Sequence, residues 1–185
     1  MSELAVDVRP ADPKDAAAIA HVHVDTWRAT YAGLLPDRYL LQMNEARQRL
    51  MWYRLLSQSA GHNEGVLVAK APGAQGGQVV GFGSAGRCRV ASLPFDGEVY
   101  TLYVAPDWQG QGLGRRLLVG LFRALHRSGL RSAGLWVLSG NPSRFFYEAM
   151  GGESCAKRQE PFAGRLLDET AYCWSDLGAW LTSRR

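Results

Sequence analysis

The chain of 185 residues is poor in the features that mark disulfide-stapled, metal-bound and membrane-spanning proteins. It has three cysteines, too few and too scattered for a disulfide framework, and it contains neither a CxxC nor an HxxxH spacing. No apolar run approaches the ~18 residues that a membrane span needs. The N-terminal segment carries acids and no apolar core of a secretory signal. We therefore expect a cytoplasmic protein with reduced cysteines and no metal.

Length and composition favour one globular domain over residues 1–185. Hydrophobic residues make up 46% of the chain and charged residues 21%, which argues against disorder. The formal net charge is only +4. Arginines nevertheless gather between residues 105 and 131, where Asp107 is the one acid, and such a cluster attracts phosphates. A nucleic-acid partner is not expected, because no RRM, KH or zinc-finger pattern accompanies this charge.

The order of elements predicts a mixed α/β fold. Apolar alternation and β-branched or aromatic runs indicate strands, whereas a period near four and Asp-Pro or Asn-Pro starts indicate helices. Leu113, Leu117, Leu121 and Leu125 give the clearest helical stripe. The strands are expected at 4–8, 65–70, 79–90, 97–106, 132–139, 153–162 and 169–177, and the helices at 13–29, from Pro36 through 45–58, at 107–129 and from Asn141-Pro142 to about 150.

A glycine-rich turn between the predicted strand 97–106 and the following helix carries the strongest chemical signal. It reads Gln109-Gly110-Gln111-Gly112-Leu113-Gly114. Amides at a helix start hold anions, and glycines let a ligand approach the backbone closely. The spacing is not a dinucleotide GxGxxG, because residue 115 is Arg, and it is not a Walker loop, because no Lys follows.

The spacing Gln-x-x-Gly-x-Gly after LYVAP resembles motif A of the GNAT superfamily of acetyl-CoA-dependent N-acetyltransferases. A later stretch, Asn141-Pro142-Ser143-Arg144-Phe145-Phe146-Tyr147-Glu148, is similar to a second segment of that family. The element order also fits over residues 4–177. The resemblance implies a GNAT fold, with a mostly antiparallel sheet of about seven strands and about four helices.

The resemblance also implies a site for acetyl-CoA as cosubstrate. The pantetheine arm would lie along Leu102, Tyr103 and Val104, where the fourth and fifth strands splay, with the Val104 N–H polarising the thioester carbonyl. The amides of Gln109, Gly110, Gln111, Gly112, Leu113 and Gly114 would hold the pyrophosphate, and Arg115 or Arg116 would add charge. Asn141 and Tyr147 would close on the thiol end.

Two residues are candidates for proton transfer. Tyr147 could protonate the departing thiolate, and Glu98 could take the proton of the acceptor ammonium. Structural interpretations stay open beside these roles: Asn141 could cap its helix, Tyr147 could pack against neighbouring phenylalanines, and Glu98 could be a solvated acid at a strand edge. In the family the first helices often form one wall of the acceptor site, so Trp27 and Tyr31 are candidates for that wall as well as for core packing.

We therefore predict transfer of an acetyl group to a primary amine by direct attack in a ternary complex. No cysteine has the setting of a covalent acyl carrier. The alternative is a CoA-binding sensor or interaction module without turnover. The acceptor, a small molecule or a peptide, is not readable from the sequence, because acceptor pockets are built from variable loops. No membrane partner is expected, and a homodimer through the C-terminal strands is compatible with the pattern.

Overall fold

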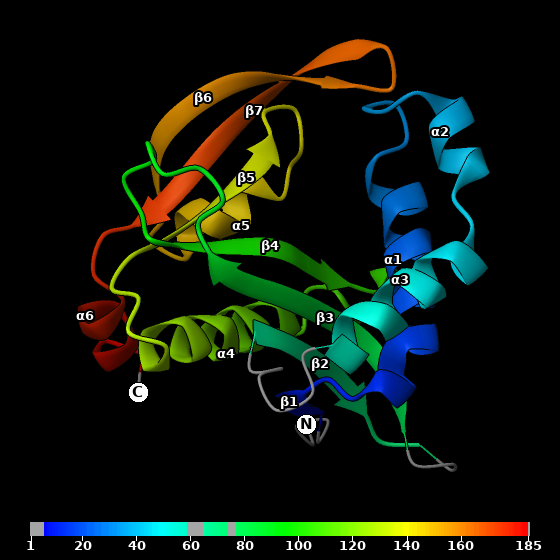
Figure 1. Ribbon diagram of the computed structural model, residues 1–185, viewed down its shortest axis with the longest axis horizontal. Helices are drawn as coiled ribbons and strands as arrows, with labels where there is room; N and C mark the ends of the chain where they lie inside the picture. The colour runs from blue at the N-terminus through cyan, green and yellow to red at the C-terminus, as the bar shows by residue number, and fades with distance from the viewer. Residues whose placement is uncertain (1–5, 59–64, 74–76, 185) are drawn as a thin grey trace.

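A single seven-stranded sheet organises the chain in the computed structural model, which describes residues 6–58, 65–73 and 77–184 (Figure 1). The strands run in the order β1-β2-β3-β4-β5-β7-β6, and every neighbouring pair is antiparallel except β4 and β5. This confirms the predicted mixed, mostly antiparallel sheet. The strands are β1 (Asp7–Pro10), β2 (Val66–Ala71), β3 (Gln78–Arg87), β4 (Gly97–Val104), β5 (Ala133–Leu138), β6 (Glu153–Phe162) and β7 (Arg165–Trp174).

Six α-helices and two short 3-10 turns complete the described residues. The α-helices are α1 (Ala16–Thr30), α2 (Asp37–Gln42), α3 (Glu45–Gln58), α4 (Leu113–Arg127), α5 (Arg144–Ala149) and α6 (Leu177–Thr182). A 3-10 turn at Pro13–Asp15 precedes α1, and a second at Pro106–Trp108 follows β4. The predicted cap at Asp12 is confirmed, since its side chain accepts a hydrogen bond from the Lys14 amide at 2.9 Å.

Both ends of the chain differ from the sequence prediction. The first strand was expected at 4–8 but begins at Asp7, and residues 1–5 lie outside the described residues. The last strand was expected at 169–177 but begins at Arg165, because Ala163 and Gly164 alone form the turn, both at positive φ. It ends at Trp174 because Asp176 caps a further helix, α6, accepting from the Ala179 amide at 2.8 Å.

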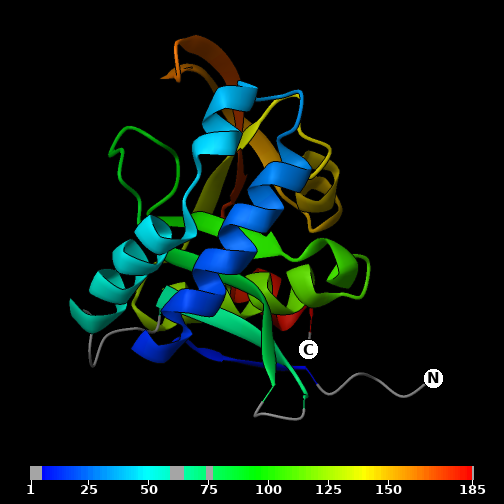
Figure 2. The same cartoon turned by 90° about the vertical axis from the view of Figure 1, so that its right-hand side faces the viewer.

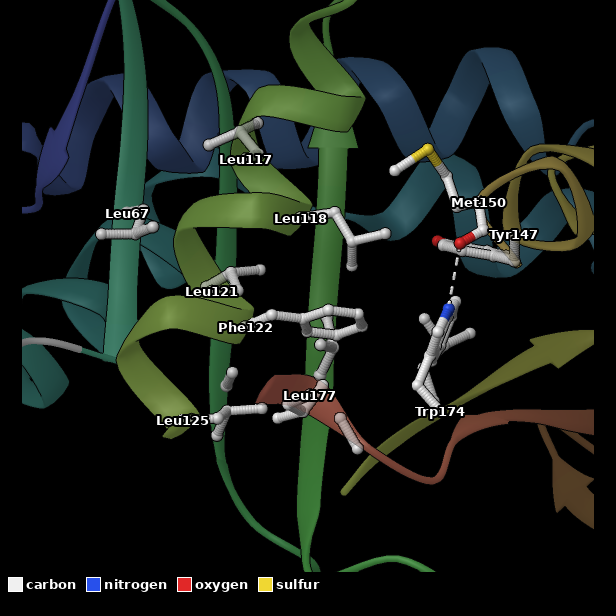
Figure 3. Packing of buried hydrophobic residues seen from close by; sticks show 14 of the residues in the cluster. Leu67, Leu117, Leu118, Leu121, Phe122, Leu125, Tyr147, Met150, Trp174 and Leu177 are labelled. Atoms are coloured by element: carbon white, nitrogen blue, oxygen red, sulfur yellow. Dashed lines mark hydrogen bonds between the residues drawn. The ribbon is translucent and has the colours of Figure 1, made fainter. Parts of the chain in front are cut away.

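Helices cover both faces of the β1–β4 half of the sheet (Figures 1 and 2). On one face α1 and α3 pack against β2 and β3 through a cluster that includes Ile19, Leu56 and Phe82. On the other face the predicted leucine stripe of α4 is buried, and Figure 3 shows Phe122 of the same helix pointing toward Trp174. The Trp174 indole in turn donates to the Met150 carbonyl at 3.1 Å.

The centre of the sheet is open because β4 and β5 separate soon after they meet. Their ladder contains only two pairs, Gly97 with Ala133 and Glu98 with Gly134. On its other side β4 stays paired with β3 as far as Val104. The rest of β4 therefore turns one edge of unpaired backbone groups toward the gap, and such groups need partners.

Candidate active site

A cavity of about 660 Å³ fills the gap between β4 and β5. Residues 99–104 of β4 form one wall and residues 135–137 of β5 form the other. The glycine-rich turn and α5 close the cavity on the α4 face of the sheet, although Gln111 of the turn does not line it and donates to the Asp107 carbonyl. Thr26 and Thr30 of α1, and Tyr31 directly after this helix, line the cavity on the opposite face. The cavity thus passes between two strands and has polar groups on both faces.

The backbone of Val104 points into this cavity. In a strand successive N–H groups point to opposite sides, and the next amide, that of Ala105, donates to the Val80 carbonyl of β3 at 2.8 Å. The Val104 N–H therefore points away from β3, toward the gap. The Val104 carbonyl accepts a hydrogen bond from the Gln109 side chain at 2.9 Å, which ties the glycine-rich turn to the end of β4.

The glycine-rich turn has the conformation and the openness that an anion site needs. Gly110 and Gly112 have φ of +73° and +78°, a region that glycine adopts without strain, and no atom lies within 4 Å of where a Cβ would stand. Gly112 is the N-cap of α4 and contributes no side-chain cap, so the first amides of this 15-residue helix are left for a ligand.

The two arginines that follow the turn have different surroundings. Arg115 lines the cavity. Arg116 extends toward β1, where its guanidinium donates to the Val6 carbonyl at 2.5 Å. Of the pair that the sequence left open, Arg115 is therefore the one placed to add charge beside the turn. Leu113, which we named for its amide, buries its side chain in the α4 core.

Asn141 and Tyr147 lie together at the end of the cavity nearest α5. Asn141 is buried, and its Oδ1 accepts from the Ser143 amide at 2.9 Å in the turn that precedes α5; the N-cap of α5 is Ser143, so Asn141 does not cap this helix. Tyr147 is buried and packs edge-on against Phe146, whereas Phe145 is 57% exposed and takes no part in that packing. Burial, assisted by the nearby Tyr31, raises the pKa of the Tyr147 hydroxyl well above its ordinary value, so the group stays protonated at neutral pH.

Several aromatic side chains surround the α1 end of the cavity. Trp27 packs at 4.9 Å from the Tyr31 ring, and His23 stacks on Tyr103 of β4 at 5.5 Å. Burial raises the pKa of both Tyr31 and Tyr103. Tyr31 and Tyr103 thus face the cavity as neutral hydroxyls, whereas Trp27, which the sequence analysis named together with Tyr31, does not occur among the described residues that line it.

Glu98 is placed differently from the other candidates. It does not occur among the described residues that line the cavity, and its side chain is only 3% exposed. Its two carboxylate oxygens accept from the backbone amide, Nε and Nη2 of Arg89, at 3.1, 3.1 and 2.5 Å. This ion pair fixes the loop between β3 and β4, and the geometry gives no support to Glu98 as a base.

Trp136 is a cavity residue that the sequence analysis did not single out. It lies on β5, and the predicted strand 132–139 offered no signal for which of its residues would face the gap. Among the described residues no group of three or more His, Cys, Asp or Glu side chains could hold a metal ion. Within the same residues no helix is long and apolar enough to cross a membrane.

Residues 22–151 match the family model for the acetyltransferase (GNAT) family. The chain belongs to the GNAT family. It is 38% identical to the N-acetyltransferase YuaI of Bacillus subtilis over 177 residues, which are 96% of this chain and 97% of YuaI. These matches span both the turn and the segment around Tyr147, the two stretches from which the family was inferred.

Solved structures agree with this assignment. YncA of Salmonella typhimurium, solved with acetyl-CoA, has a TM-score of 0.67 and 27% identity to this GNAT protein, with 94% of each chain covered. The PaiA N-acetyltransferase of Thermoplasma acidophilum, solved with coenzyme A, has a TM-score of 0.66 and 19% identity over 90% of this chain and 98% of its own. The predicted GNAT fold is thereby confirmed.

Proposed function

We propose that this N-acetyltransferase moves the acetyl group of acetyl-CoA to a primary amine by direct attack in a ternary complex. The observation that carries the proposal is the continuous cavity from the glycine-rich turn, along the unpaired edge of β4, to Tyr147. Its relatives support the choice of cosubstrate, since YncA was solved with acetyl-CoA and PaiA with coenzyme A.

The residues present fit such a ligand. The open, positive-φ glycines and the uncapped start of α4 suit a pyrophosphate, and Arg115 adds a positive charge beside them. The free edge of β4 at Leu102, Tyr103 and Val104 suits an arm that contains amides. The cosubstrate supplies an acetyl group activated as a thioester, and Val104 is placed to polarise its carbonyl through the backbone N–H.

Tyr147 supplies the proton that the departing thiolate needs. Its hydroxyl lies in the cavity and stays protonated at neutral pH, which is the state required of a general acid. Asn141 accepts a hydrogen bond from the Ser143 amide and so stabilises the turn that leads into the helix carrying Tyr147. The acid and the carbonyl-polarising amide therefore come from two elements on opposite sides of the gap.

A panel of amines with acetyl-CoA, with released thiol as the readout, tests this function. We expect thiol release that depends on one class of amine, together with a stoichiometric acetylated product. Acetyl-CoA binding without amine-dependent release for any member of the panel would instead support a binding module. A stable labelled acetyl-protein, formed before amine is added, would contradict direct attack.

A further inference from the structure

The acceptor end of the cavity lies on the face of the sheet that carries α1. The glycine-rich turn lies at the start of α4, on the other face, so an amine meets the acetyl end from the α1 side. The β6–β7 hairpin arches over this side and reaches α2, as both views show (Figures 1 and 2). Phe162 near its tip packs 4.7 Å from Tyr39, and Arg38 donates to the Ala163 carbonyl at 3.2 Å.

This hairpin carries an excess of negative charge behind Trp136 of the cavity wall, although its charged residues do not themselves line the cavity. Arg158 on β6 pairs with Glu169 on β7 at 2.8 Å and lies 3.6 Å from Glu160. Two carboxylates thus share one guanidinium and leave a net charge of −1. The guanidinium carbon lies 4.1 Å from the ring centre of Trp136, which itself lines the cavity. The charged group is therefore one side chain away from the acceptor space.

Glu169 is the carboxylate of this group that adjoins the cavity hydroxyl of Tyr31. Glu169 faces Leu138 across the β5–β7 ladder, and Leu138 packs in the same cluster as Tyr31. Burial is the main cause of the raised pKa of Tyr31, and the negative charge of Glu169 acts in the same direction. Oε2 of Glu169 binds Arg158, and within the described residues Oε1 has no hydrogen-bond donor. The Glu169 side chain is 17% exposed.

We infer that Glu169, held by Arg158 beside Tyr31, receives the acceptor as an ammonium cation and takes the proton that must leave before attack. One N–H proton of the ammonium moves to Oε1 of Glu169. The freed nitrogen lone pair forms the bond to the acetyl carbon. The bond from that carbon to sulfur breaks as Tyr147 donates its proton to the sulfur, and the tyrosinate so formed takes the second N–H proton of the nitrogen, which leaves a neutral amide and restores Tyr147. Glu169 then releases its proton to solvent. The acceptor is therefore a primary amine that binds as a cation between aromatic rings of the protein. This inference rests on the proposed function.

A binding experiment tests the cation preference without turnover. The full chain, saturated with CoA, is titrated by ligand-observed NMR with n-butylammonium and with 1-butanol, a neutral molecule of similar shape. We expect Glu169→Gln to weaken butylammonium binding by about tenfold or more and to leave butanol binding unchanged. Asp168→Asn is the matched control, because Asp168 pairs with Gln159 on the other face of the hairpin. Equal butylammonium affinity in wild type and Glu169→Gln, or none in wild type, overturns the inference.

A kinetic comparison tests the proton step. Hydroxylamine is uncharged at neutral pH and has no ammonium proton to lose, so Glu169→Gln is expected to lower kcat/KM for n-butylamine about tenfold and to spare hydroxylamine. Equal losses for both nucleophiles would reduce Glu169 to a structural role and overturn the inference. Failure of the wild type to bind CoA, measured first by calorimetry, would instead contradict the proposed function. If neither n-butylamine nor hydroxylamine causes thiol release, the butylammonium titration alone decides the inference.

Discussion

His23 makes the stability of this protein depend on pH in a way that can be calculated. Burial lowers the pKa of its imidazole to about 4. The ring stacks on Tyr103, and its Nδ1 accepts from the Trp52 indole at 3.3 Å, which assigns the neutral tautomer with its proton on Nε2. Protonation would place a second N–H against that indole donor. The fold therefore favours the neutral ring.

The sign and size of the effect follow from the two pKa values. The folded pKa lies below the unfolded value of about 6.5, so the unfolded chain takes up the proton first and stability falls as the pH drops from about 6.5 toward 4. Between pH 7 and pH 5 the loss is about 2 kcal/mol, a sizeable part of the 5–15 kcal/mol that holds most domains together.

Urea unfolding at pH 7 and pH 5, followed by tryptophan fluorescence, measures this loss. We expect His23→Gln to be less stable than wild type at pH 7 but to lose about 2 kcal/mol less between the two pH values. His21→Gln is the matched control: His21 lies on the same helix with its side chain 61% exposed, and its removal should leave the pH dependence of wild type. A His23→Gln protein that loses as much stability as wild type over this range would refute the calculation.

Three further substitutions test the site. Gly112→Val should abolish acetyl-CoA binding in calorimetry while the fold survives, because no protein atom crowds the added Cβ. Gly129→Val is the control: Gly129 has a similar φ of +84° and is equally open, so this variant should carry the same backbone strain and bind acetyl-CoA normally. Unchanged affinity in Gly112→Val would show that the phosphates bind elsewhere. Tyr147→Phe should lower kcat by roughly 10–100-fold, with acetyl-CoA affinity and Tm little changed, and a native kcat would leave only the packing role. Glu98→Gln should lower stability by about 1–2 kcal/mol through its bonds to Arg89, with kcat within about twofold of native; a large loss of kcat at unchanged Tm would restore Glu98 as the base.

The parts of the fold that the sequence predicts are those fixed by local pattern. The stripe of α4 repeats every four residues, and each of its leucines is buried where the pattern requires. The Asp12 cap and the glycine turn likewise depend on residues that lie next to each other in the chain. The shortened hairpin turn and the C-terminal helix were missed, although Asp176 three residues before Ala179 is a cap signal that could have been found.

The separation of β4 from β5 could not be predicted in this way, because it depends on pairing between distant strands. Nothing in the run from Gly97 to Val104 tells which of its amides lack a partner, and only the resemblance to the family suggested the splay. The proximity of Glu169 to Tyr31 has the same origin: 138 positions separate them, and the pairing of β7 with β5 places Glu169 opposite Leu138, which packs in the cluster of Tyr31. Site residues joined only by tertiary structure leave no local signal.

One extra residue in β4 changes the face of the sheet to which Glu98 points relative to Leu102 and Val104, although the strand itself was predicted correctly. With strict alternation Glu98, Leu102 and Val104 would share a face. In the β3–β4 ladder Ser84 pairs with Thr101 and Ala85 with Val99, so Tyr100 is left over as a bulge. Val99 therefore packs toward α4 together with Leu102 and Val104, although their spacing is odd, and Glu98 points to the opposite face. The bulge lies where β4 leaves β5 and so marks the point at which the cavity begins, whereas Glu98 precedes it and is held by Arg89 outside the cavity lining.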